Sequence, residues 1–242
     1  DKFENLEGAD LILVCVKAWQ VKEIAMGLKS IIHSNTFVLP LQNGILAAEE
    51  LSAEINPNNI IGGLCKIISK IESPGVINHS GIEPIIVIGE FKSTASKRII
   101  DINETLNNSG INSRIADDII AEILKKFMAI CVSGLLAITR STYGVVRELK
   151  ETRNLMTTLI TEIYTVSQKA GIILIPDIVE KTIAFIDTYP FDSTSSLTRD
   201  IWEGKPSEID YQNGTVVKLS KKYGVDTPVN EFIYHCLLPM EI

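Results

Sequence analysis

Two adjacent lysines, Lys125 and Lys126, lie in a long apolar segment with helical periodicity. Residues three, four and seven positions apart share a helix face, so Lys125 stands with carboxylates and Lys126 on an apolar face. That apolar face carries Ile119, Ile123, Ile130 and Ser133. Partial burial lowers the pKa of a lysine, which would let Lys126 donate a proton to a developing alkoxide near neutral pH. The alternative is a lysine whose ammonium reaches water past the isoleucines.

A carboxylate, Glu208, follows a loop that contains Gly204 and Pro206. Ser207 and Asp210 have the spacing of a capping box, which predicts that Glu208 lies in the first turn of a helix over 207–223. There the helix dipole favours the charged carboxylate, and Glu208 can accept a hydrogen bond from a substrate hydroxyl. The alternative is an acid that only stabilises the helix start. Ser195 and Ser196 have the same ambiguity between helix cap and ligand contact.

Polar loops follow two apolar runs of strand length, residues 9–16 and 36–41. A helical pattern over 19–32 separates the runs, which predicts a βαβ unit with parallel strands. The carboxyl ends of parallel strands form the crevice where ligands sit in open sheets. Lys17 and Asn43 follow these strand ends, so we expect both loops at one edge, although Asn43-Gly44 is also an ordinary turn.

The remaining elements predict an α/β part followed by an all-helical part. A helix over 45–55, a strand over 60–65 and a helix over 97–106 continue the alternation of a doubly wound sheet. After Pro74-Gly75, residues 76–79 and 85–88 suggest an antiparallel hairpin that closes the sheet. Further helices are predicted over 117–138, 149–170, 176–187, 195–202, 207–223 and 227–238.

Composition excludes several classes of protein. The 242 residues are 45% hydrophobic and 22% charged, which is typical of a globular fold rather than a disordered chain. A net charge of −7 without a long basic run argues against binding to nucleic acid or to an anionic membrane. The longest uncharged apolar stretch, 127–139, is too short to span a bilayer. The four separated cysteines suggest reduced core thiols in a cytoplasmic protein, and the three histidines lack the spacing of a metal site.

Five ordered segments resemble the ketopantoate reductase family. They are ADLILVCVKAWQV at 9–21, LPLQNGI at 39–45, PGVINH at 74–79, LKKFMAICVSGLLAITRSTYG at 124–144, and SSLTRDIWEGKPSEIDYQNG at 195–214 with YGVDTPVNEFIYHCLL at 223–238. The segment around Glu208 is the most specific of these. The resemblance covers essentially the whole sequence.

This resemblance implies an NADPH-dependent reduction of 2-dehydropantoate to (R)-pantoate, on the route to pantothenate and coenzyme A. By that likeness Lys126 is the general acid, and Glu208 orients the substrate hydroxyl near the cofactor ribose. Ser196 would bind the substrate. Asn43 would contact the nicotinamide end of NADP and the catalytic lysine, while Lys17 would line the cofactor side. The expected partners are a small 2-oxo acid and, in a homodimer, a second copy.

The sequence also departs from the family pattern. Many members carry asparagine one turn after the lysine and again a turn later, where this chain has Ile130 and Ser133-Gly134. Ser133 could replace one of these substrate contacts. The cofactor-cradling GxGxxG loop is absent.

We therefore expect residues 1–116 to be the remnant of a Rossmann-like NADP-binding domain with an incomplete doubly wound sheet, within a longer protein. Residues 117–242 would form the helical substrate-binding and catalytic domain. The alternatives are a related two-domain dehydrogenase for another 2-oxo acid, and a non-catalytic fragment or interaction module.

Overall fold

The computed structural model describes residue 3 and residues 6–79, 81, 83–92 and 96–241. The chain divides into two compact units, which are described separately below. One unit, called the α/β unit, comprises Asp1–Gln42 and Leu46–Ile123. The other, called the helical unit, comprises Asn43–Ile45 and Leu124–Ile242.

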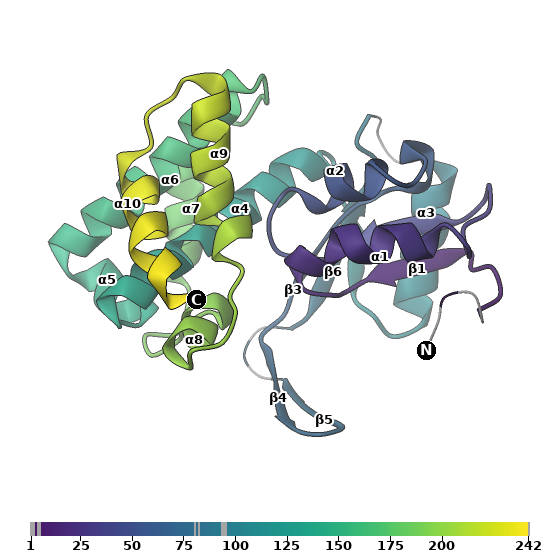
Figure 1. The fold of residues 1–242 in the computed structure, drawn as a ribbon, viewed down its shortest axis with the longest axis horizontal. Coiled ribbons are helices and arrows are strands. Elements are labelled where there is room, and N and C mark those ends of the chain that lie inside the picture. The colour runs from purple at the N-terminus through teal and green to yellow at the C-terminus, as the bar shows by residue number, and fades with distance from the viewer. Residues whose placement is uncertain (1–2, 4–5, 80, 82, 93–95, 242) are drawn as a thin grey trace. The chain divides into compact units, whose positions relative to one another are not determined.

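A βαβ motif opens the α/β unit, as predicted. Strands β1 (Leu11–Val14) and β2 (Phe37–Pro40) pair in parallel, and a short 3₁₀ turn over Ala18–Gln20 leads into helix α1 (Val21–Leu28) between them (Figure 1). Helix α1 buries Val21, Ala25 and Leu28 in a cluster that includes Val14 and Val38 of the strands. This apolar spacing explains the helix, because the buried residues recur every three or four positions.

A second group of strands extends the α/β unit. Strand β6 (Ile85–Gly89) pairs antiparallel with β3 (Gly62–Lys66) and parallel with β7 (Ser113–Ile115), and an isolated bridge joins Val38 to Ile60 just before β3. Helices α2 (Ala47–Ser52) and α3 (Lys97–Asn108) and a 3₁₀ turn over Pro57–Asn59 complete the unit. Ile61, Ile88 and Ile99 pack in one core cluster between the strands and α3.

The predicted hairpin has a different pairing. Strand β5 (Val76–His79) pairs with β4 (Ser69–Ser73) through the Pro74-Gly75 turn, not with the strand at 85–89. The prediction was wrong because β4 is largely polar and therefore lacks the apolar run by which a strand is recognised. Ile71 and Ile77 face each other across this two-stranded ribbon, and both side chains are exposed.

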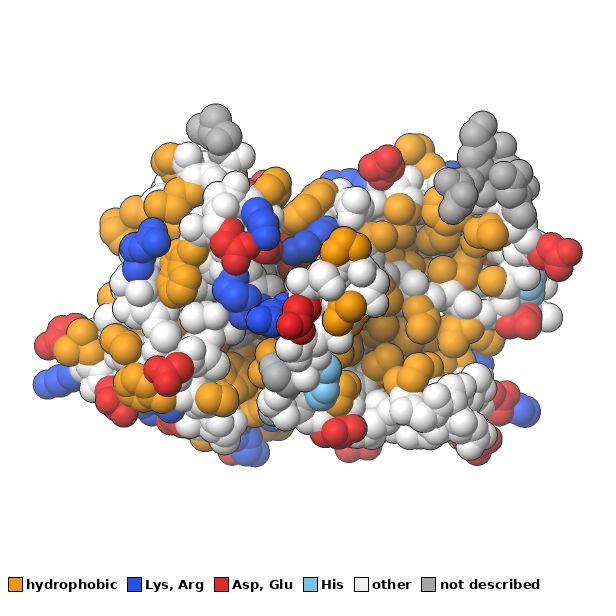
Figure 2. Space-filling model, turned by 90° about the horizontal axis from the view of Figure 1, so that it is seen from below, with side chains coloured by type: hydrophobic (Ala, Val, Ile, Leu, Met, Phe, Trp, Pro, Cys, Tyr) orange, Lys and Arg blue, Asp and Glu red, His pale blue; other side chains and the backbone are white. Residues whose placement is uncertain are grey.

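Large apolar side chains reach the surface elsewhere in the α/β unit, and one face of this surface appears in Figure 2. Exposed examples are Leu13 in β1 and Met26 in α1. Among the residues that the structure describes, β1 has β2 as its only strand neighbour. Within the described residues, the other edge of β1 therefore carries backbone donors and acceptors that no strand pairs.

The helical unit is built around a long central helix. Helix α4 (Ile119–Thr139) begins in the α/β unit and contributes its residues from Leu124 onward to the helical unit. The elements that follow are α5 (Tyr143–Glu148), α6 (Lys150–Lys169), α7 (Ile178–Asp187), α8 (Ser196–Trp202), a 3₁₀ turn (Ile209–Tyr211), α9 (Asn213–Tyr223), α10 (Pro228–Leu237) and a 3₁₀ turn (Leu238–Met240). This architecture confirms the predicted class of an α/β part followed by an all-α part.

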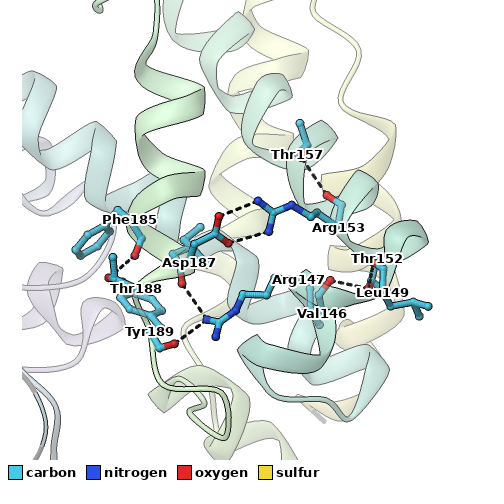
Figure 3. A network of polar contacts seen from close by, with 11 residues as sticks. Val146, Arg147, Leu149, Thr152, Arg153, Thr157, Phe185, Asp187, Thr188 and Tyr189 are labelled. Carbon is cyan, nitrogen blue, oxygen red and sulfur yellow. Dashed lines mark hydrogen bonds and ion pairs between the residues drawn. The ribbon is translucent and has the colours of Figure 1, made fainter.

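Helices α5, α6 and α7 are joined by two arginines (Figure 3). Both terminal nitrogens of Arg153 donate to the carboxylate of Asp187, each over 2.8 Å. Arg147 donates to the backbone oxygen of Tyr189 over 2.7 Å. Arg147 also donates to the Ile186 backbone oxygen over 3.4 Å, so its bonds satisfy carbonyl groups at and just after the end of α7, where helical partners run out.

The cysteine prediction is only partly right. Cys131 is buried and Cys65 is half-buried, but Cys15 and Cys236 are exposed, so these two are not core residues. Cys236 lies on the outer face of α10, and Cys15 directly follows β1. In the described part of the chain, none of the helices combines the length and apolar character that a bilayer crossing requires.

Candidate active site

A short excursion of the chain brings the loop after β2 into the helical unit. Gly44 has φ of +94°, and a Cβ atom on it would stand 2.9 Å from the backbone oxygen of Tyr211. Glycine is therefore required here both for the left-handed backbone and for the close approach. This contact holds Asn43–Ile45 against the segment that follows Glu208.

Asn43 and Glu208, both predicted site residues, meet in the helical unit. The side-chain Nδ2 of Asn43 donates to Oε2 of Glu208 over 3.4 Å, a long hydrogen bond. Glu208 is only 6% exposed, and Asn43 is half-buried. A buried carboxylate needs hydrogen-bond donors, and the amide supplies one. The structure thus joins residues that are 165 positions apart in the sequence.

The backbone around Glu208 differs from the predicted helix start. Helix α9 begins at Asn213, and Glu208 precedes the 3₁₀ turn over Ile209–Tyr211 instead of lying in a first α-helical turn. The Ser207 hydroxyl donates to Oε1 of Glu241 over 2.6 Å and accepts from the Ile209 backbone over 3.2 Å. It therefore does not form the predicted capping box, and Glu208 does not lie in the first turn of α9, where a helix dipole would favour its charge.

Lys126 lies on a partly accessible strip of α4. Between Leu124 and Ala137, Lys125, Lys126 and Ile130 are half-buried and every other residue is buried. Lys126 and Ile130 are four positions apart and share one helix face. An ammonium-bearing side chain and an aliphatic one are therefore both partly accessible on this face. Glu122, three positions before Lys125 on α4, places Oε1 of its carboxylate 2.9 Å from Arg114 Nη2, within the α/β unit.

The two serines at the start of α8 differ in position. Ser195 caps the helix, because its Oγ accepts from the Thr198 backbone over 3.0 Å. Ser196, the first residue of α8, is exposed. The Thr198 hydroxyl donates to the Ser133 backbone oxygen over 3.0 Å, which ties the start of α8 to α4. Ser196 is therefore an exposed hydroxyl at an anchored helix end, and its contact with substrate stays a prediction.

Ser133 has surroundings unlike those of the other candidates. Its side chain is 1% exposed, and the neighbouring Tyr143 phenol is also buried. Burial raises the pKa of Tyr143 to about 12, so this phenol stays neutral. A substrate contact by Ser133 stays a prediction, and its burial favours a role in packing.

The loops after β1 and β2 lie at the same sheet edge, as parallel pairing requires. Lys17 is exposed, and its ammonium stands 5.5 Å from the centroid of the Trp19 ring. Gln42 was not predicted from the sequence to have a structural role at this edge. Its Nε2 donates to the backbone oxygens of Val14 and Val16 over 2.8 and 3.1 Å, so it ties the two strand ends together. Its sequence signal is a polar residue directly after a buried strand.

Metal-ligating side chains do not gather into a candidate site among the described residues. Across them, no group of three or more histidine, cysteine, aspartate or glutamate side chains could hold an ion. The donors that the structure assembles are an amide, a carboxylate, hydroxyls and an ammonium. These groups suit hydrogen bonding and proton transfer.

Family models match both parts of the chain. The model described as "Ketopantoate reductase PanE/ApbA" matches residues 1–93, and the model described as "Ketopantoate reductase PanE/ApbA C terminal" matches residues 118–241. A 2-dehydropantoate 2-reductase of Aquifex aeolicus (strain VF5) is 29% identical over 232 residues, covering 93% of this chain and 74% of the relative. The uncharacterized oxidoreductase YkpB of Bacillus subtilis (strain 168) is 26% identical over 226 residues, covering 93% and 75%.

Solved structures share the fold. A 2-dehydropantoate 2-reductase from Geobacter metallireducens GS-15 superposes with a TM-score of 0.88 at 24% identity, covering 100% of this chain and 80% of that one. A D-mandelate dehydrogenase with NADH and anilino(oxo)acetate gives 0.86 at 24%, covering 99% and 79%. At this identity the likeness establishes the fold. Because the family models match most of the residues, the chain belongs to the ketopantoate reductase family.

Proposed function

We propose that this chain reduces 2-dehydropantoate to (R)-pantoate with NADPH. The observation that carries the proposal is the pair formed by Asn43 and Glu208, in which a strand-end amide meets a buried carboxylate. Such a pair can hold a hydroxyl that donates to the carboxylate and accepts from the amide. The relatives named as 2-dehydropantoate 2-reductases support the same reaction.

The described side chains fit one end of a nicotinamide dinucleotide. The exposed ammonium of Lys17 suits a phosphate or ribose oxygen, and the amide of Asn43 can pair with a carboxamide. When bound, the reduced nicotinamide supplies the hydride that adds to the carbonyl carbon. The dinucleotide phosphates usually sit on a GxGxxG loop, which these 242 residues do not contain. Lys17 and Asn43 are therefore assigned to the nicotinamide and ribose end.

The proton step belongs to Lys126. Its Nζ gives a proton to the carbonyl oxygen as the carbon gains hydride, so the ketone becomes a secondary alcohol, and the neutral amine then takes a proton from water. Glu208 accepts a hydrogen bond from the substrate hydroxyl, and Ser196 donates one to the substrate. Half-burial of Lys126 limits competition from water at this proton.

A second substrate class is favoured by Ile130. This side chain shares the accessible face of α4 with Lys126, and a hydrophobic contact there favours a 2-oxo acid whose substituent is apolar. The reaction and the role of Lys126 stay the same. Only the group attached to the 2-oxo acid differs.

Turnover by the full-length protein tests the proposal. NADPH oxidation is measured with 2-dehydropantoate and, in parallel, with branched aliphatic and aromatic 2-oxo acids. A kcat/KM at least tenfold higher for 2-dehydropantoate supports the first assignment, and the reverse order supports the second. Absence of turnover with every 2-oxo acid contradicts both. A homodimer, expected from the dimeric ketopantoate reductase of Staphylococcus aureus, is tested by light scattering on the same sample.

A further inference from the structure

The helical unit contains a buried network of hydrogen-bonded polar side chains that have no part in the reaction proposed above. It consists of Glu162 on α6, Asn230 on α10 and Asn213 on α9, which are 7%, 0% and 0% exposed. We propose that Asn213 is a positioning residue, which holds the turn that carries Glu208 against helix α4. This inference rests on the proposed function, because it assigns Glu208 and Lys126 to one reaction.

A single amide group of Asn213 spans two helices. Its Nδ2 donates to the Cys131 backbone oxygen on α4 over 3.2 Å and to Oδ1 of Asn230 on α10 over 3.0 Å. Both hydrogens of the amide are therefore used, and both bonds are buried. Buried polar bonds of this kind fix a relative position more narrowly than apolar packing does.

Glu162, at the other end of this network, fixes the orientation of the Asn230 side chain. Glu162 Oε2 accepts from the Asn230 side chain over 2.6 Å and from its backbone over 3.0 Å, while Oε1 accepts from the Val229 backbone over 2.9 Å. The Asn230 amide also donates to the Leu159 backbone oxygen over 3.1 Å. With its nitrogen committed to α6, Asn230 must point its oxygen at Asn213. Asn213 is thus anchored through α10 to α6.

Helix α4 is shaped to receive Asn213. A Cβ atom on Gly134 would lie 2.7 Å from Asn213 Oδ1 and 2.6 Å from Cγ2 of Ile233, so only glycine permits this approach. Oδ1 of Asn213 is buried without a hydrogen-bond partner among the described residues. An unsatisfied buried acceptor destabilises the fold. An apolar residue at position 213 would leave no unsatisfied acceptor. We therefore attribute the presence of an asparagine to the hydrogen bonds that its Nδ2 donates.

The hydrogen bonds of Asn213 Nδ2 hold the turn after Glu208 in place. The Tyr211 backbone donates to the Glu208 backbone oxygen over 3.0 Å, and the Thr215 hydroxyl donates to the Asp210 backbone oxygen over 3.1 Å. These bonds make the turn and the first residues of α9 one rigid piece, with Asn213 as its attachment to α4. Cys131 lies five positions after Lys126 on the same helix. The Asn213 contact therefore sets where Glu208 stands along the helix that carries the proposed acid.

Asn213→Ala in the full-length protein tests the inference, with Asn59→Ala as the matched control. Asn59 is also a buried asparagine whose Nδ2 donates to two backbone oxygens, of His33 and Thr36, but it lies in the α/β unit. We expect Asn213→Ala to lower kcat by roughly 10²-fold, the loss that a small misplacement of a catalytic group causes, with the KM for NADPH unchanged. Asn59→Ala should lower the Tm by a similar amount and keep kcat within about threefold.

Hydrogen exchange supplies a readout that does not need turnover. The backbone N–H groups of Ile209 and Tyr211 should exchange faster in Asn213→Ala and stay unchanged in Asn59→Ala. An unchanged kcat in Asn213→Ala, or an equal loss in the control, overturns the positioning role. Unchanged exchange at the turn also overturns it, even if the wild-type protein shows no reductase turnover and the proposed function itself fails. If Asn213→Ala does not fold, Asn213→Ser, which keeps one donor, replaces it in the same comparison.

Discussion

At the scale of single residues, the proposed proton step depends on Lys126. Lys126→Ala removes the acid and keeps the apolar face of α4, so kcat should fall by about 10² to 10⁴-fold while NADPH still binds. Steady-state kinetics give kcat, and quenching of tryptophan fluorescence gives NADPH binding. Lys125→Ala is the matched control, because Lys125 is also half-buried and lies one position away on the helix. An unchanged kcat in Lys126→Ala removes this lysine from the mechanism.

We expect Ile130 to discriminate between the two proposed substrate classes. Ile130→Asn places an amide one helical turn from Lys126, where it can pair with a substrate hydroxyl. We expect the ratio of kcat/KM for 2-dehydropantoate to that for an unsubstituted branched 2-oxo acid to rise by roughly tenfold or more. Ile130→Val keeps an apolar side chain and should leave the ratio within about twofold. If both variants leave the ratio unchanged, Ile130 does not contact the substrate substituent.

Sequence reasoning reached the individual site residues unevenly. Helix periodicity predicts a more apolar face for Lys126 than for Lys125, but both side chains are half-buried, so the choice of Lys126 stays a prediction. The choice of Glu208 came from the motif around it and stays a prediction as well. The meeting of Asn43 with Glu208 could not be derived from spacing, because it depends on how the chain leaves β2 and enters the helical unit. The buried hydrogen bonds of Asn213 and Asn230 could not be predicted either, because an asparagine near the start of a helix is usually interpreted as a helix cap.

At the scale of elements, Gly44 determines how the loop after β2 docks. Gly44→Ala adds both a strained left-handed backbone and a contact of 2.9 Å with the Tyr211 oxygen. Gly171→Ala, at φ of +83° with nothing within 4 Å of the new Cβ, adds the strain alone. We expect both to lower the free energy of unfolding by about 1 kcal/mol or more, and Gly44→Ala by the larger amount. Urea denaturation measures both, and equal losses would show that the loop does not depend on the Tyr211 contact.

The link between α6 and α7 makes stability depend on pH. Hydrogen bonding to Arg153 holds the pKa of Asp187 below its ordinary value of 3.8. A folded-state pKa below the unfolded one means that the charged carboxylate stabilises the fold above about pH 4, and that this contribution is lost as pH falls through the folded pKa. Asp187→Asn should therefore lower the free energy of unfolding at neutral pH, and the difference from wild type should shrink below about pH 4.

The matched control for this link lies at the start of α7. Asp177 pairs with Lys181 over 3.0 Å, but both side chains are more than half exposed. Exposed pairs contribute little, so Asp177→Asn should change stability by less than about 0.5 kcal/mol at any pH. Urea denaturation at several pH values measures both variants. A loss for Asp187→Asn that is constant from neutral to acidic pH would contradict the assigned role of the carboxylate.

Long periodic elements could be predicted from the sequence, and short ones could not. In helices α4, α6 and α7 apolar residues recur with helical period over several turns, so these helices could be located from the sequence. Helix α5 has six residues and strand β7 has three, too few for a period to show, and neither was predicted. The false helix start at Ser207 arose because its hydroxyl bonds to Glu241, a partner 34 positions away.

At the scale of the whole molecule, the change from alternating strands and helices to helices alone predicted the two-part architecture. The absence of a GxGxxG pattern is read directly from the 242 residues, whereas the interpretation of residues 1–116 as the remnant of a larger cofactor domain stays a prediction. The extent of the helical unit was harder to derive, because Asn43–Ile45 belongs to it although these residues follow a strand of the other unit. A segment this short gives no periodic signal, and its assignment depends on contacts with residues near Tyr211.

Binding of the cofactor to the full-length protein should stabilise the native state. A ligand that binds only the folded state adds about 2.7 kcal/mol at a concentration one hundred times its Kd, which raises the Tm by several degrees. We expect NADPH to raise the Tm more than NADH does at equal concentration, as measured by calorimetry. Lys17→Ala should reduce the rise with NADPH, because the exposed ammonium is the cation that this loop offers to a cofactor oxygen, whereas Lys22→Ala on α1 serves as the control. If neither nucleotide changes the Tm, the protein does not use a nicotinamide cofactor, and the assignments of Lys17 and Asn43 fail together.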